Sequence, residues 1–130
     1  MKAAVIQAIE EFKAQFGDPR VEAAELPDGG ARVVVQAMEL GPPYQQIDSW
    51  FGFTLTPLYP YADVYPHFLR PDLCRLDGQP LQAPIHVGNT FYGQPAVMVS
   101  RRTRLTGPAN PNSALLKLLK VQKWLRSPSQ

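Results

Sequence analysis

The stretch RVEAAELPDGGARVVVQAMEL, from Arg20 to Leu40, contains two candidate strands joined by one turn. Its second half centres on Val33-Val34-Val35, and valine is favoured in strands because its branched side chain packs well on a pleated surface. Pro27-Asp28-Gly29-Gly30 separates the halves, and these are residue types that tight turns require. The stretch therefore predicts an antiparallel hairpin with strands at 20–26 and 31–40.

On its N-terminal side the pattern changes to a helical period. Val5, Ile9, Phe12 and Phe16 recur at intervals of three or four residues, which places them on one face of a helix. Gly17 follows as a stop signal, so we expect a helix over residues 3–16.

On its C-terminal side, Gly41-Pro42-Pro43 ends the hairpin, and residues 47–58 predict a third strand that carries three of the aromatic residues. Residues 57–71 are rich in proline and tyrosine. Because each proline removes a donor from a sheet ladder, we expect an ordered shoulder here and no central strand. Residues 77–96 look loop-rich, and 96–100 predict a short apolar strand or a buried turn.

The last predicted element is a helix at about 113–126, with Asn112 or Ser113 as its N-cap. Its broad apolar face is accompanied by a basic run that includes Lys117 and Lys120. Together these elements predict one α+β domain over residues 1–130, with an antiparallel meander of three to four strands between two helices.

The composition excludes several kinds of site. One cysteine, Cys74, permits neither an internal disulfide nor a cysteine zinc cluster, and two histidines leave few ligands for a metal. No phosphate-binding glycine loop, metal-ligand spacing or nucleophile elbow is present, so we expect no cofactor and no small-molecule enzyme. Charged residues interrupt the first apolar stretch before it reaches the length of a signal peptide, and no run is long enough to cross a bilayer, which favours a cytoplasmic chain without membrane contact.

The charges are unevenly distributed along the chain. All eleven carboxylates lie at or before Asp77 and face six cations there, whereas seven cations and no carboxylate follow Gly78. The densest basic cluster comprises Arg101, Arg102 and Arg104. Either the charges of the two halves neutralise each other in the fold, or the second half forms a basic face that binds an acidic partner or nucleic acid.

Several segments resemble the ubiquitin-conjugating (UBC) fold. Tyr59-Pro60, with Pro66 six residues later, is similar to the Tyr-Pro…Pro turn that follows the third strand in that superfamily. Arg70-Pro71-Asp72-Leu73 then stands where those enzymes carry His-Pro-Asn and an aliphatic residue. The segments 99–102 and 121–125 resemble parts of a divergent bacterial family with this fold. The resemblance implies a role in a bacterial ubiquitin-like modifier pathway, with the modifier and its activating enzyme as partners.

Two positions depart from the pattern of those enzymes. Asp72 replaces the asparagine that donates a hydrogen bond to the developing oxyanion, and an ionised aspartate accepts but cannot donate. Pro80 stands eight residues later, where the acceptor cysteine would be. The usual thioester reaction is therefore not expected at this position.

Cys74 is the one thiol that could replace the missing nucleophile. Arg70 and Arg75 would favour its thiolate, and His67 could serve as a base if the chain bends at Pro71. Alternatively, the cysteine packs as a small apolar residue.

These observations leave two functions open. One is a UBC-like protein that carries the modifier on Cys74 or, without catalysis, binds the modifier or its activating enzyme. The other is a basic module, built around Arg101, Arg102 and Arg104, that binds nucleic acid or an acidic protein. Aromatic residues are not interleaved with these arginines along the sequence, which argues against single-stranded nucleic acid.

Overall fold

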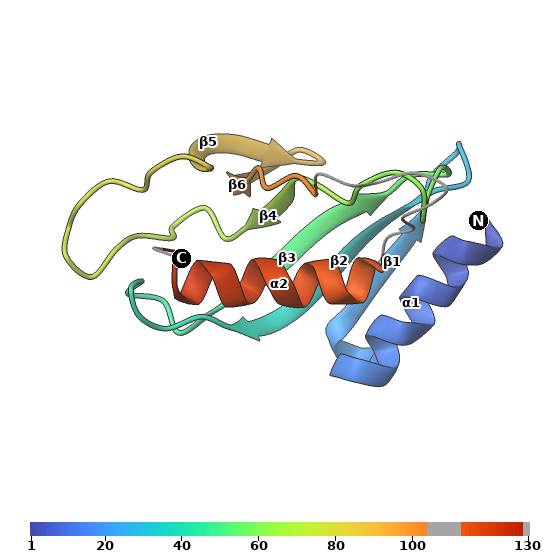
Figure 1. Cartoon of the computed structure of the whole chain (residues 1–130), viewed down its shortest axis with the longest axis horizontal. Helices are drawn as coiled ribbons and strands as arrows, with labels where there is room; N and C mark the ends of the chain where they lie inside the picture. Colours follow the sequence, from blue (N-terminus) through green and yellow to red (C-terminus); the bar gives the residue numbers. More distant parts are fainter. Residues whose placement is uncertain (104–112, 129–130) are drawn as a thin grey trace.

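The computed structural model describes residues 1–103 and 113–128 (Figure 1). In chain order its elements are α1 (Ala3–Phe16), the short 3-10 helix η1 (Asp18–Arg20), β1 (Val21–Glu25), β2 (Ala31–Glu39), β3 (Asp48–Leu55), β4 (His67–Leu69), β5 (Ile85–Phe91), β6 (Gln94–Val99) and α2 (Ala114–Arg126). The six strands of the described part form one antiparallel sheet in the order β1-β2-β3-β4-β6-β5. No helix in these ranges is long and apolar enough to span a bilayer.

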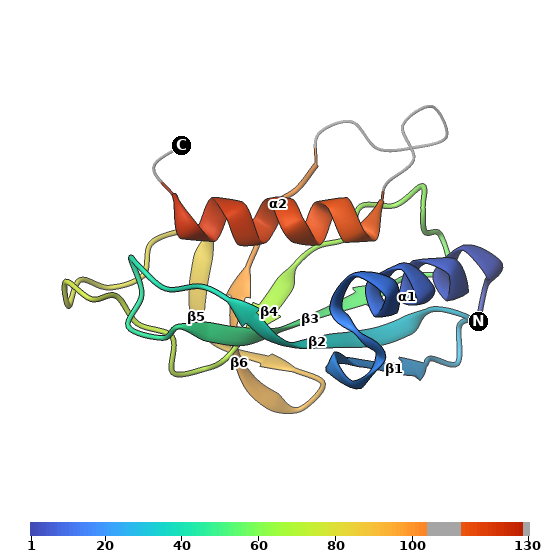
Figure 2. The same ribbon diagram turned by 90° about the horizontal axis from the view of Figure 1, so that it is seen from below.

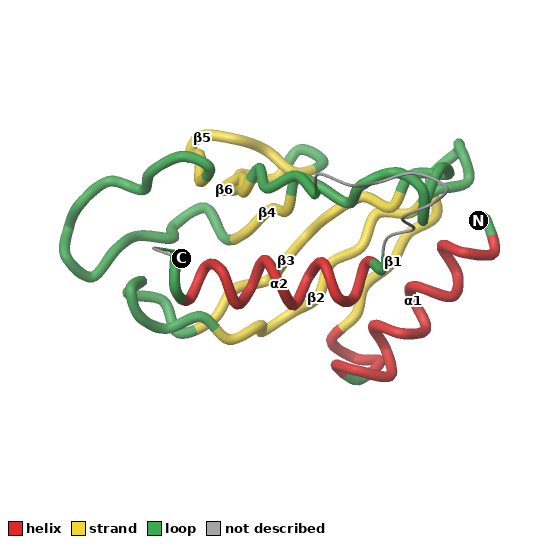
Figure 3. Tube along the Cα trace, in the orientation of Figure 1, coloured by secondary structure: helices red, strands yellow, loops and turns green. Residues whose placement is uncertain are grey.

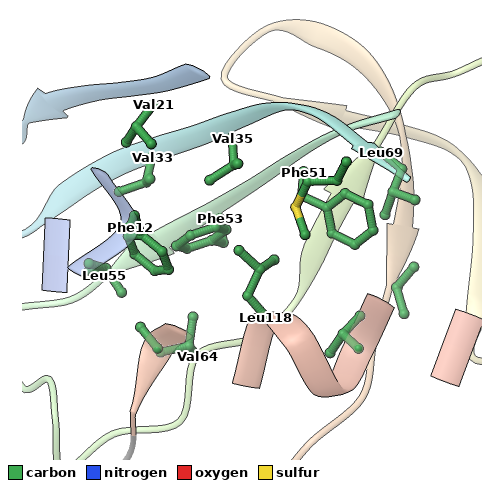
Figure 4. Close-up of a cluster of buried hydrophobic side chains, with 14 of the residues drawn as sticks. Phe12, Val21, Val33, Val35, Phe51, Phe53, Leu55, Val64, Leu69 and Leu118 are labelled. Carbon is green, nitrogen blue, oxygen red and sulfur yellow. The ribbon is translucent and has the colours of Figure 1, made fainter. Parts of the chain in front are cut away.

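Both helices lie on the same face of the sheet, and the core fills the space beneath them (Figures 1 and 2). The apolar stripe of α1 is buried as its period predicts. The rings of Phe12 and Phe53 pack edge to face, with their centroids 5.2 Å apart. From α2, Leu118 reaches the same cluster (Figure 4). The helices predicted at 3–16 and 113–126 are confirmed, and Ser113 is the N-cap, since its hydroxyl accepts a hydrogen bond from the Leu116 N–H at 3.2 Å.

The predicted hairpin is also confirmed. Its strands span 21–25 and 31–39, where 20–26 and 31–40 were predicted. The Gly30 N–H donates to the Asp28 side chain at 2.9 Å, and Gly29 adopts φ +94°, a value that favours glycine. In β2, Ala31, Val33 and Val35 point into the core, while the residues between them face away from the helices. The third strand ends at Leu55, three residues earlier than predicted.

Two sequence-based expectations about the sheet are wrong. The meander of three to four strands is a sheet of six, because the loop-rich stretch 77–96 contains β5 and the first half of β6, and β4 lies inside the proline-rich shoulder (Figure 3). The rest of β6 coincides with the short apolar strand predicted at 96–100. β4 fits there because it has three residues and contains neither Pro66 nor Pro71. In β5, a register shift beside Gly88 (φ +76°) breaks the alternation of buried and exposed residues by which strands are recognised.

The remainder of the shoulder is packed on the core at Tyr59 and Val64. Tyr59 is buried, and its hydroxyl accepts a hydrogen bond from the Ala114 N–H at 2.9 Å, which ties the shoulder to the start of α2. Tyr61, by contrast, is exposed.

The β5–β6 hairpin curls over the face of the sheet that the helices leave open (Figure 2). Its Phe91 ring lies directly on Gly52 of β3, and a Cβ added at Gly52 would come within 2.6 Å of that ring. Phe68 and Trp50 flank the same ring, with centroids 4.9 and 6.2 Å away. Gly52 is therefore required because only a residue without a side chain admits the ring.

We expect Gly52→Ala to lower the free energy of unfolding by about 1–3 kcal/mol, since the ring held by Phe68 and Trp50 cannot move aside without strain. Urea unfolding should measure this loss. Phe91→Leu removes the two closest contacts, at 2.6 and 2.9 Å, and leaves the Trp50 ring at 3.0 Å, so the same glycine substitution should cost less than half as much in that background. Equal costs in the two backgrounds would show that Phe91 does not limit this position.

Candidate functional site

Cys74 lies where two loops are held together by hydrogen bonds. The Gln46 side chain accepts from the Cys74 N–H at 3.0 Å, and its Nε2 donates to the Asp72 carbonyl at 3.0 Å and to Cys74 Sγ at 3.4 Å. The Gln45 N–H donates to the Cys74 carbonyl at 2.9 Å. Leu73 is buried beside it and fixes this turn on the core. The half-buried thiol thus has an amide partner, and that partner is a neutral donor.

The two arginines expected to promote the thiolate are engaged by carboxylates instead. Arg70 donates through Nε and Nη2 to both oxygens of Asp72, at 2.6 and 2.8 Å, and Arg75 holds Asp77 in the same manner at 3.0 and 2.8 Å. The Arg70 hydrogen bonds lower the pKa of Asp72, and those from Arg75 lower the pKa of Asp77 to about 2. Both carboxylates are ionised at neutral pH, so Asp72 offers acceptors only.

His67 does not form a dyad with Cys74. It points from β4 into the core, where it is fully buried and its ring lies 5.4 Å from that of Phe53. Neither ring nitrogen has a hydrogen-bond partner among the described residues. Burial, reinforced by the nearby Lys117 and opposed by Asp63, lowers the pKa of His67 to about 3. His67 is therefore a neutral core residue that cannot reach the thiol as a base.

The basic cluster is divided by the structure. Arg101 and Arg102 are exposed, and their guanidinium groups stack on rings from distant segments, at 4.3 Å from the Trp124 centroid and 4.7 Å from that of Tyr65. Arg104 lies outside the described residues. Sequence reasoning missed these stacks because each arginine is separated from its ring by more than twenty positions.

Lys117 was expected to extend the positive surface of Arg101, Arg102 and Arg104, and this expectation is wrong. Its side chain and that of Asp63 are each 9% exposed and form an ion pair at 3.1 Å, while Lys117 also donates to the Thr103 hydroxyl at 2.7 Å. The Thr103 N–H donates to Asp63 at 2.6 Å. Although burial favours its neutral form, these hydrogen bonds hold the pKa of Asp63 below its ordinary value. The segment after β6 is therefore anchored to α2 by a partly buried polar cluster.

Gln46, which organises the Cys74 loop, was not identified from the sequence. It lies 28 positions before the cysteine, in a loop whose residues carry no motif, so only the folded chain brings the two together. Among residues 1–103 and 113–128, no three histidine, cysteine or carboxylate side chains are grouped to bind a metal ion.

Comparisons of the chain with models of protein families, with curated proteins and with solved structures give no match.

The burial of His67 predicts an acid-sensitive fold. Its pKa is about 3 in the folded chain and 6.5 when unfolded, so below pH 6.5 the unfolded state binds a proton that the folded state excludes. The free energy of unfolding should then fall by up to about 1.4 kcal/mol for each pH unit below that value. Urea titrations between pH 7 and about 5 cover the range before carboxylates begin to protonate.

His67→Leu should remove this slope. His86→Gln is the matched control, because His86 is exposed on β5 and its substitution should leave the slope unchanged. A wild-type slope that survives His67→Leu would contradict the assignment.

Proposed function

We propose that this chain is a UBC-like protein of a bacterial ubiquitin-like modifier pathway that binds the modifier or its activating enzyme without carrying a thioester. The observation that carries the non-catalytic role is the state of Cys74: its neighbours are the Gln46 amide and two arginines already bound to carboxylates. A thioester-forming cysteine needs a base or a cation that favours its thiolate; the buried His67 cannot reach the thiol as a base, and Arg70 already forms an ion pair with Asp72.

The order of the elements supports the UBC-like part of the proposal. A helix precedes a three-strand meander, the Tyr59-Pro60 turn follows β3, and the segment beginning at Arg70 follows β4 directly. That segment presents an Arg70–Asp72 ion pair where conjugating enzymes of the resembled family present an amide donor. Pro80 is exposed and offers no nucleophile.

Incubation with the cognate activating enzyme, modifier and ATP tests the absence of a thioester. We expect no adduct that dithiothreitol removes, and we expect Cys74→Ala to bind the modifier or its activating enzyme as tightly as the wild type in calorimetric titrations. A dithiothreitol-sensitive adduct that disappears in Cys74→Ala would make the chain a carrier with a relocated cysteine. Absence of binding to both proteins would overturn the pathway assignment.

Arg101 and Arg102 are the residues we propose for contact with an acidic partner surface. Both are exposed, and neither has a carboxylate within ion-pair distance among the described residues. Their stacks on Trp124 and Tyr65 hold the guanidinium groups in place, which reduces the entropy lost when they bind a carboxylate or phosphate. The same surface is the basis of the alternative function, binding of nucleic acid.

Reversal of either charge, Arg101→Glu or Arg102→Glu, should slow association with the partner several-fold at low salt and weaken its salt dependence. Stopped-flow association rates measure this. Lys13→Glu on α1 changes the net charge equally and should have a smaller effect. Equal effects of all three substitutions would show that only net charge matters, and tighter binding of single-stranded DNA than of either pathway protein would favour the alternative.

A further inference from the structure

The tip of the β5–β6 hairpin lies over the face of the sheet opposite α1 and α2 (Figure 2). A groove of about 370 Å³ lies beneath it. Its floor comes from β1 and β2, and its wall is formed by aromatic side chains of β3 and the hairpin. The groove is lined by residues that include Glu22, Arg32, Val34, Trp50, Phe91 and Tyr92. The surface proposed above for an acidic partner involves α2, on the other face, so this groove is independent of it.

The aromatic wall is held in one position. Tyr92 and Gly93 form the two-residue turn of the hairpin with φ of +49° and +84°, and a tyrosine in this region is strained. Two contacts compensate for the strain. The Tyr92 hydroxyl is hydrogen-bonded to the Thr54 hydroxyl at 2.7 Å, and the Tyr92 and Phe91 rings pack edge to face with their centroids 4.7 Å apart. The groove is therefore formed before any ligand arrives, which lowers the entropic cost of binding.

The two ends of the groove carry opposite charges. The Arg32 guanidinium lies 5.3 Å above the Tyr92 ring and has no carboxylate within ion-pair distance in the described part of the chain. The Glu22 carboxylate accepts a hydrogen bond from Gln36 at 2.6 Å and has no cationic partner there. Because Glu22 is paired with Val34 in the sheet, the two charges are offset by two residues, about 7 Å along the strand.

We propose that this groove binds the C-terminal end of an extended peptide. The terminal carboxylate pairs with Arg32, which can hold it through two parallel hydrogen bonds. An apolar terminal side chain packs against Trp50 and Phe91, and a basic side chain two positions earlier reaches Glu22. The spacing fits a peptide because Cα atoms two residues apart in an extended chain lie about 7 Å apart, so a terminal carboxylate at Arg32 leaves the residue two positions earlier level with Glu22.

The probe is the peptide acetyl-Ser-Gly-Lys-Ala-Phe with a free carboxylate, titrated into the ¹⁵N-labelled full chain. We expect shifts of the Trp50 indole signal, assigned with Trp50→Phe, and of the amide signals of Val34 and Tyr92. The same peptide with a C-terminal carboxamide should bind about tenfold more weakly, since it loses the charge-assisted bonds to Arg32. The version with glutamate in place of lysine should also bind more weakly.

Arg32→Gln should weaken binding of the carboxylate peptide by about the same factor and should affect the carboxamide peptide much less. Arg32 is exposed, so this variant should fold, as the dispersion of its amide spectrum will verify. Arg101→Gln, on the other face, is the matched control and should bind like the wild type. Equal binding of carboxylate and carboxamide, an equal loss in Arg101→Gln, or shifts outside the groove would overturn the proposal.

Discussion

The two halves of the sheet are joined through the three residues of β4. On one side β4 meets β3 at the pair Phe68–Gly52, and on the other it is paired with β6 over its whole length. His67 and Leu69 point into the core under the helices, and Phe68 points to the opposite face. A strand this short contributes few backbone hydrogen bonds, so its side chains on both faces must secure the connection.

That arrangement links features that are far apart in the sequence. His67 fills a core position beside Phe53 and near the Asp63–Lys117 pair, so the strand, the shoulder and α2 share one buried region. On the other face, Phe68 supports the ring of Phe91 and thereby the wall of the groove. The same three residues thus lie between the Asp63–Lys117 pair on one face and the groove on the other.

The parts of the fold that the sequence predicted are those with uninterrupted periodicity. The apolar stripe of α1, the alternation of buried and exposed residues in β2 and the turn at Asp28 can each be recognised from a few neighbouring residues. β4 and β5 were not predicted. β4 has only three residues, too few to show an alternating pattern, and β5 has an irregular pairing register with β6. At the candidate site, Cys74 was identified by type, but its environment depends on Gln46 and on ion pairs that spacing alone does not reveal. The charge asymmetry proved partly internal, since Lys117 and Arg126 pair with Asp63 and Glu39 from the acidic half.

The two-residue turn at Tyr92 and Gly93 also fixes the length of its hairpin. Side chains along a strand alternate between faces, so one inserted residue would turn Phe91 away from Gly52 and direct its neighbour into a space without room for a side chain. Most surface turns tolerate insertions well, whereas this one has no such freedom. Among relatives of this chain, we therefore expect the exposed loop at 78–84 to differ in length and this turn to keep its two residues.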